Sequence, residues 1–144
     1  QVLSSAASDV YKRQDISDVL YLMSRSNFHN WYGKEEFDKY VIPPLEANQF
    51  IILRDEGRVP FVFASWAFPT HDQVSQYVKE LEFMPEGYEG GGDIPWAIDF
   101  IAEGGKRNVA LGFRKVKNVL STKGYNQAFW LRAETQKLGF HQWG

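Results

Sequence analysis

The sequence predicts an α+β domain in which helices flank one central, mixed and mostly antiparallel β-sheet. Three observations lead to this prediction. Segments with helical spacing of apolar residues alternate with short β-rich segments along the 144-residue chain. Two adjacent β-rich runs are separated by a tight turn, which makes part of the sheet antiparallel. A strand, a helix and another strand then follow in order, and this arrangement allows a parallel pair.

Residues 1–14 are set apart from the domain. They lack the charged-then-apolar layout of a secretory signal peptide, and we expect them to be a flexible or non-native tail. Residues 15–144 are enough for a single domain with one core.

Four helices are predicted from recurring apolar residues. The first begins at Asp15, its expected N-cap, and the second is broken or restarted at Pro43 and Pro44. The third begins at Thr70 or Asp72, and the fourth covers about residues 108–120. The residues expected to face the core are Ile16, Val19, Leu20 and Met23, then Phe37, Tyr40 and Val41, then Val74, Tyr77, Val78 and Leu81, and finally Val109, Phe113, Val116 and Leu120.

The strands are predicted from short runs of β-branched and aromatic residues. A hairpin covers about residues 50–68, with its turn at Asp55-Glu56-Gly57. Further strands are expected at about 96–102, at 126–134 and, as a last one, at 137–144. Residues 84–95 are rich in glycine and proline, so we expect a mobile loop there.

Composition excludes several classes of protein. The chain is 44% apolar and 16% aromatic, so it can bury a core, and its net charge of −2 does not point to nucleic acid. It has no cysteine, which excludes disulfides and thiolate metal sites and fits a cytoplasmic protein. Its three histidines lack metal-ligand spacing, so no metal site is expected. The apolar runs are too short for a membrane span.

His29 and Asp99 are the candidate catalytic residues. His29 stands among aromatic residues just ahead of a helical segment, a position where a histidine is more often structural than catalytic. Asp99 interrupts the apolar strand "WAIDFIA", and a carboxylate in a buried strand must be hydrogen-bonded or paired. The alternative is an alternating strand with Asp99 on its wet face. A buried aspartate beside a histidine would fix the imidazole tautomer and stabilise its charged form.

A basic stretch spans residues 106–123. It holds six of the 16 basic residues and none of the 18 acidic ones. The simplest interpretation is a solvated helix face. The functional alternative is a docking surface for a phosphopantetheine group, an acidic carrier protein or nucleic acid. Nucleic acid is the weakest of these, because aromatic residues are not regularly interleaved with the basic ones along the helix.

Three segments stand in the order "SNFHNW", "IPPLEANQFIILRDEGRVPFVFASWA" and "WAIDFIA". Together they resemble the RTX toxin-activating lysine acyltransferases, which fatty-acylate protoxins. The resemblance implies a fold like the Gcn5-related N-acetyltransferases (GNAT-like). It also implies acyl carrier protein as acyl donor, with no bound cofactor, and a protein lysine, such as one of an RTX protoxin, as acceptor. A homodimer is left open.

The resemblance also assigns roles to residues. It implies catalysis by His29 and Asp99, with His29 acting either as a general base or as a nucleophile that forms an acyl-imidazole. The fatty chain is expected between the hairpin and the Trp96 strand, lined by Phe63, Trp66 and Trp96. The residues expected to bind the carrier are Lys106, Arg107, Arg114, Lys115 and Lys117.

Two other functions remain compatible with these residues. One is an acetyl-CoA-dependent N-acetyltransferase, although "EGGKRNVALG" lacks the usual glycine spacing of a pyrophosphate loop. The other is a non-catalytic binding protein with the same fold. Such a protein has no need for His29 and Asp99 to meet, so their distance in the folded chain discriminates between a binder and an enzyme.

Overall fold

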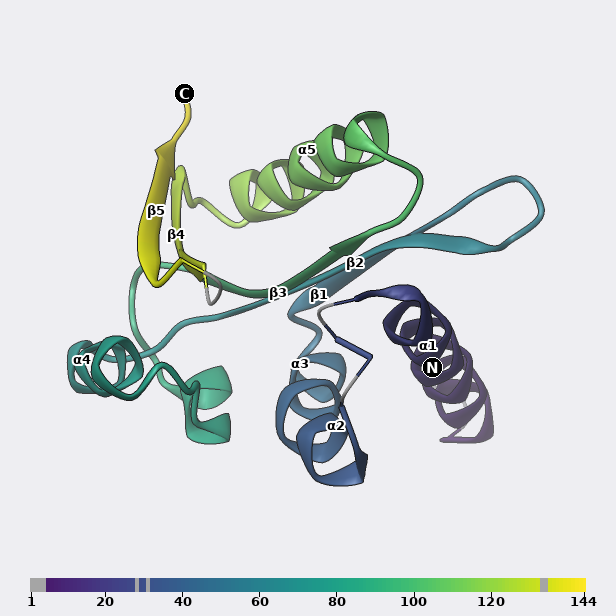
Figure 1. Ribbon diagram of the computed structural model, residues 1–144, viewed down its shortest axis with the longest axis horizontal. Helices are drawn as coiled ribbons and strands as arrows, with labels where there is room; N and C mark the ends of the chain where they lie inside the picture. Colours follow the sequence, from purple (N-terminus) through teal and green to yellow (C-terminus); the bar gives the residue numbers. More distant parts are fainter. Residues whose placement is uncertain (1–4, 28, 31, 133–134) are drawn as a thin grey trace.

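The computed structural model describes residues 5–27, 29–30, 32–132 and 135–144, and it shows one five-stranded sheet with helices on both faces (Figure 1). The helices are α1 (Ser5–Arg25), α2 (Lys34–Tyr40), α3 (Ile42–Ala47), α4 (His71–Glu80) and α5 (Lys106–Thr122), with a 3₁₀ helix η1 (Pro85–Glu89). The strands are β1 (Phe50–Arg54), β2 (Pro60–Ala67), β3 (Trp96–Ala102), β4 (Gln127–Arg132) and β5 (Lys137–Gln142). The predicted fold class is confirmed.

The sheet is mostly antiparallel, and its strands lie in chain order from β1 to β5. Only β3 and β4 run parallel, because α5 connects them and returns the chain to the same end of the sheet. Helix α5 covers one face, and α1, α2 and α3 lie on the other, with α4 near the far end (Figure 1). No helix in the described part of the chain is long and apolar enough to cross a bilayer.

Helix α1 begins earlier than the sequence indicates. It starts at Ser5, so most of the segment set apart as a tail is helical, and the domain boundary at residue 15 stays a prediction. Asp15 therefore lies inside the helix, and its expected role as an N-cap is wrong. Its carboxylate instead lies 2.9 Å from Arg54 Nη2, and Asp18 lies 2.7 Å from the same atom, which ties α1 to β1.

The other helix boundaries follow from residues visible in the sequence. Pro43 and Pro44 occupy the first turn of α3, where a missing N–H costs nothing, so the prolines restart the helix as expected. Thr70 caps α4: its hydroxyl accepts from Gln73 N at 3.2 Å, and Gln73 Oε1 accepts from Thr70 N at 2.8 Å.

Four residues expected in the core instead have more than a third of their surface exposed to solvent. They are Leu20, Val78, Leu81 and Phe113. Leu81 lies at the left-handed C-cap of α4 rather than on its buried face. The ring of Phe113 stacks on Phe100 at 4.6 Å between centroids and borders a cavity rather than the core.

A β-bulge in β3 determines which side chains face the α1–α3 layer. Ser65 of β2 pairs with Asp99 and Trp66 pairs with Ala97, so Ile98 is an extra residue in β3. A bulge reverses the alternation of side chains along a strand. Asp99 and Ile101 on one side of the bulge and Trp96 on the other therefore all turn toward the same helical layer.

Residues 84–95, where the glycine and proline content predicts a loop, contain a 3₁₀ helix and a buried tyrosine. Pro85–Glu89 forms η1, which places Tyr88 in the core at 2% exposure. Its hydroxyl donates to the backbone oxygen of Tyr40 at 3.2 Å, and its ring packs edge-on against Phe83. A single buried aromatic residue thus anchors a segment that composition alone marks as flexible.

We expect Tyr88→Ala to lower the free energy of unfolding by about 3–5 kcal/mol, because truncating a buried aromatic leaves a cavity. Tyr88→Phe is the matched control. It keeps the ring and loses the hydrogen bonds of the hydroxyl, including the one to Tyr40, at a cost of about 0.5–1.5 kcal/mol for each bond. Urea unfolding of the three proteins measures both values. Equal stability of wild type and Tyr88→Ala would contradict the anchoring role.

Candidate functional site

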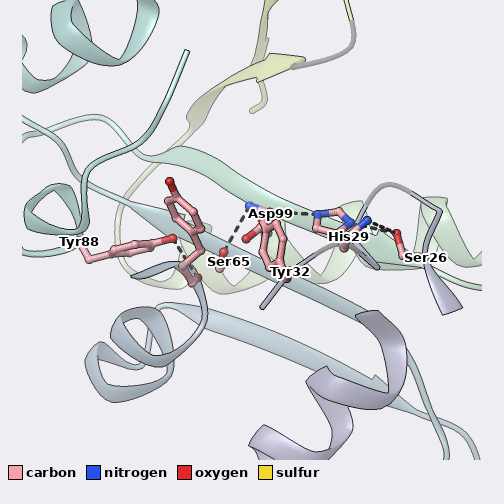
Figure 2. Close-up of polar contacts among 7 residues, drawn as sticks. Ser26, His29, Tyr32, Ser65, Tyr88 and Asp99 are labelled. Atoms are coloured by element: carbon pink, nitrogen blue, oxygen red, sulfur yellow. Dashed lines mark hydrogen bonds and ion pairs between the residues drawn. The ribbon is translucent and has the colours of Figure 1, made fainter. Parts of the chain in front are cut away.

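His29 and Asp99 meet in the interior of the protein (Figure 2). His29 follows α1, Asp99 lies in the middle of β3, and Nε2 of the imidazole is 3.1 Å from Oδ1 of the carboxylate. Their side chains are only 7% and 6% exposed. The bulge at Ile98 is the reason that Asp99 faces this layer, and the wet-face alternative for Asp99 is wrong.

Ser26 extends this pair to a third residue. Its Oγ lies 2.9 Å from Nδ1 of His29 and also accepts from the backbone N–H of His29 at 3.2 Å. Figure 2 shows serine, histidine and aspartate in one line. Ser26 was not among the residues predicted from the sequence. The signal that could have found it is the three-residue spacing from His29, which brings both side chains together in the turn after α1.

The hydrogen bonds assign the tautomer of His29. An ionised carboxylate only accepts, so Nε2 carries the proton and donates it to Asp99. Nδ1 then has its lone pair available and accepts from the Ser26 hydroxyl. The nitrogen able to take up a proton is therefore Nδ1, on the side of the ring away from Asp99.

Asp99 is held in place by further contacts. The hydroxyl of Tyr32 is 3.4 Å from Oδ1, and the backbone N–H of Asp99 donates to Ser65 Oγ at 3.3 Å. Its other oxygen, Oδ2, is buried and has no hydrogen-bond partner among the residues that the structure describes. A buried carboxylate is costly unless it is compensated, and here Oδ1 takes most of the compensation.

A cavity of about 1010 Å³ contains this site. Ser26, His29 and Asp99 all line it, together with residues of α2, α4, α5 and β4. Its size is at the upper end of the range for small-molecule pockets. The buried pair therefore lies on a cavity wide enough for more than one reacting group.

The divergence of β3 and β4 creates part of this cavity. These parallel strands pair only at Trp96 with Phe129 and at Ala97 with Trp130. Beyond Ala97 both strands line the cavity, β3 as far as Glu103 and β4 as far as Arg132. The opening connects the face that carries His29 with the face covered by α5, because Phe113 of α5 also lines it.

A family model matches residues 10–143 of the chain, and its description is the RTX toxin acyltransferase (HlyC) family. The chain belongs to this family. The recognition made from the sequence is therefore confirmed, and it rests on almost the whole described domain rather than on the short segments alone.

Relatives of known name agree with this family. The leukotoxin-activating lysine-acyltransferase LktC of Pasteurella haemolytica-like sp. (strain 5943B) is 28% identical over 126 residues, which are 86% of this chain and 72% of that protein. The RTX-II toxin-activating lysine-acyltransferase ApxIIC of Actinobacillus pleuropneumoniae is 31% identical over 87 residues, or 60% of this chain and 54% of that protein. The protein-lysine myristoyltransferase RtxC of Kingella kingae is 27% identical over 91 residues, or 63% and 54%.

The alignments span between about half and about three quarters of these relatives' own lengths. The family and the relatives' names together support an acyltransferase that modifies protein lysines. The donor and the protein substrate of this RTX toxin acyltransferase family member are treated below as proposals.

The three aromatic residues expected to line the fatty chain are buried in the core and do not line the cavity. Phe63, Trp66 and Trp96 are each at most 6% exposed, and they belong to three separate clusters of the core. The gap expected between the hairpin and the Trp96 strand is absent, because β2 and β3 are directly paired. The aromatic residues that line the observed opening between β3 and β4 are Phe100, Phe113 and Trp130.

The basic stretch forms the outer side of α5. Lys106, Arg107, Arg114 and Lys115 are exposed, and Lys117 is half-buried. None of the ion pairs found among the described residues involves these five side chains. The helix starts at Gly105, which has a φ of 97°, a left-handed conformation that favours glycine, and its first turn carries no acidic residue.

Four tyrosines surround the charge of Asp99, and all of them have a raised pKa. Burial is the largest cause for each, and the negative charge of Asp99 adds to it. The pKa of Tyr40 is raised to about 12, and those of Tyr32, Tyr77 and Tyr88 are also raised well above the ordinary value. These phenols remain protonated at neutral pH, and the phenol of Tyr32 donates a hydrogen bond to the carboxylate.

We expect the free energy of unfolding to fall as pH rises above about 10, the ordinary tyrosine pKa. In that range the unfolded chain has lost phenolic protons that the folded chain retains, so rising pH favours unfolding. Tyr88→Phe should reduce the slope by up to about 1.4 kcal/mol per pH unit. Urea unfolding from about pH 8 to about pH 11 measures the slope. An unchanged slope in Tyr88→Phe would contradict the raised pKa.

Proposed function

We propose that the protein moves a fatty acyl group from acyl carrier protein to the ε-amino group of a lysine in a protein substrate, of the RTX protoxin type. The observation that carries the proposal is the buried contact between His29 and Asp99 on a large cavity, in a member of the RTX toxin acyltransferase family. A non-catalytic binding protein would not need this contact. We further propose that the reaction takes place in the cytoplasm.

The chemistry requires a base because a lysine amine is almost wholly protonated at neutral pH. The lysine ammonium first gives one proton to solvent, and His29 Nδ1 then accepts a second N–H proton as the neutral amine attacks the thioester carbonyl. The new C–N bond forms, the C–S bond breaks, and the carrier thiolate leaves and takes up the proton. Asp99 holds the Nε2–H tautomer throughout and stabilises the imidazolium.

Ser26 lies beside the proposed base and also lines the cavity. Its hydroxyl contacts Nδ1 at 2.9 Å and lines the cavity, so it can accept the amine proton while passing its own to the imidazole. Attack by His29 itself, to give an acyl-imidazole, needs Ser26 to move aside. Mass spectrometry of the protein mixed with donor alone separates these routes, because only the second leaves an acyl group on His29.

The donor fits the α5 side of the opening between β3 and β4. The phosphopantetheine arm of the carrier is long enough to need such a passage, and the helix N-terminus with Lys106 and Arg107 suits its phosphate. The exposed cations Arg114 and Lys115 extend the same positive surface toward an acidic carrier. The donor then approaches from one face of the sheet while His29 acts on the other.

We expect His29→Ala to lower acyl transfer by at least about 10²-fold, the usual contribution of a general base. Asp99→Asn should also impair transfer, because the amide no longer stabilises the imidazolium. Ser26→Ala should lose less than His29→Ala, since Nδ1 remains. Mass spectrometry of candidate substrates incubated with acylated carrier protein measures transfer. An active His29→Ala protein that melts like wild type would overturn this mechanism.

We expect charge reversal at Arg114 and Lys115 to weaken binding of acyl carrier protein. Added salt should slow transfer by the wild type, because exposed charges are screened beyond about 8 Å at physiological ionic strength. Arg58, which is exposed in the β1–β2 connection, provides a charge-matched control for reversal. Fluorescence anisotropy measures the affinity for the carrier. An affinity that changes neither with salt nor with charge reversal would mean that this surface is only a solvated helix face.

A further inference from the structure

Three tyrosines wall the end of the cavity nearest α2 and α4. Tyr32, Tyr40 and Tyr77 all line it, and they come from three separate segments of the chain. The rings of Tyr32 and Tyr40 are 5.9 Å apart between centroids, and Tyr32 is 5.5 Å from the imidazole of His29. An aromatic wall thus runs from the catalytic histidine toward this end.

Carboxylates form the rim of the same end. Glu36, Glu80 and Glu82 line the cavity there, against one cation, Lys39. The ammonium of Lys39 lies 3.2 Å from Glu35 and 3.9 Å from Glu82, so its charge is largely directed at Glu35, outside the lining. The rim therefore carries a net negative charge.

Asp99 adds a second, independent negative charge. Its side chain is 94% buried, it forms part of the cavity wall, and its Oδ2 has no hydrogen-bond partner among the described residues. Its charge reaches this end of the cavity, since it contributes to the raised pKa of both Tyr40 and Tyr77. A buried carboxylate with an unused oxygen attracts a positive group more strongly than an exposed one.

We infer that this end of the cavity, walled by Tyr32, Tyr40 and Tyr77 and rimmed by Glu36 and Glu82, binds a cationic side chain of the acceptor protein. The inference rests on the proposed function, because it assigns the acceptor to the face opposite the donor. The cation is either the reacting lysine before it loses its proton or a basic residue next to it.

Physical reasons favour a cation over a fatty chain at this end. Aromatic faces bind ammonium and guanidinium groups through their quadrupoles, and aromatic cages recognise them in other proteins. Carboxylates beside a fatty chain would be desolvated without compensation. The charge at this end of the cavity is also opposite to the charge on the donor side. The carboxylate rim suits a basic acceptor, and the basic face of α5 suits an acidic donor.

Butylammonium is a direct probe, because it copies the lysine side chain and needs no knowledge of the protein substrate. NMR spectra of ¹³C-tyrosine-labelled protein, recorded without acyl donor, should show saturable shifts at Tyr40 and Tyr77 as butylammonium is added. Butanol has a similar size and no charge, and it should cause none. Equal shifts with both probes, or no saturable shift with butylammonium, would overturn the inference.

Variants of the rim and wall test the charge and the aromatic face separately. Glu82→Gln and Glu36→Gln should each weaken butylammonium binding by about two- to fivefold, as should Tyr40→Leu, whereas Tyr40→Phe should keep most of it. Glu56→Gln, in the exposed β1–β2 turn, is the charge-matched control. Loss of binding in Glu56→Gln as large as in Glu82→Gln would overturn a local role for the rim.

Transfer assays then identify the source of the cation. Glu82→Gln should raise the KM for a peptide whose only charge is its lysine if the reacting lysine binds here. It should raise the KM only for a peptide with an added arginine if a neighbouring residue binds. Equal KM values for both peptides in wild type and Glu82→Gln would overturn the inference. Absence of transfer by wild type, with butylammonium binding intact, would instead overturn the proposed function.

Discussion

The buried contact between His29 and Asp99 is the constraint on which the rest of the site depends. A carboxylate at 6% exposure is stable only if its charge is compensated, and the imidazole N–H and the Tyr32 hydroxyl both converge on Oδ1. The same contact sets the tautomer of His29, and in the proposed mechanism it leaves Nδ1 as the nitrogen that takes up the proton. One hydrogen bond therefore both compensates the buried charge of Asp99 and fixes the tautomer of His29.

Backbone geometry delivers the two partners. The bulge at Ile98 re-aims Asp99 toward the α1–α3 layer, and the turn after α1 presents His29 and Ser26 to it. Arg54 of β1 binds Asp15 and Asp18 of α1, so the helix that ends just before Ser26 is fixed against the sheet. The bulge, the turn after α1 and the Arg54 ion pairs together position the imidazole.

The divergence of β3 and β4 gives the site two sides of opposite polarity. Basic side chains of α5 lie on one side, and tyrosines with a carboxylate rim lie on the other. The proposed reaction, from an acidic carrier to a basic acceptor, keeps its substrates apart until their reacting groups meet. A sheet that opens between two parallel strands provides such a meeting point, because neither substrate has to cross the core.

The sequence by itself determined the order of the elements, the parallel pair, the family and the candidates His29 and Asp99, because periodicity, turn residues and a carboxylate in an apolar strand are local signals. Tertiary structure alone decided that these two residues touch across 70 positions, that Ser26 joins them and that Phe63, Trp66 and Trp96 lie in the core. It also placed Tyr88 in the core, which anchors an apparent loop. The physical reason is that a strand pattern does not reveal a bulge, and a bulge reverses which face each side chain occupies.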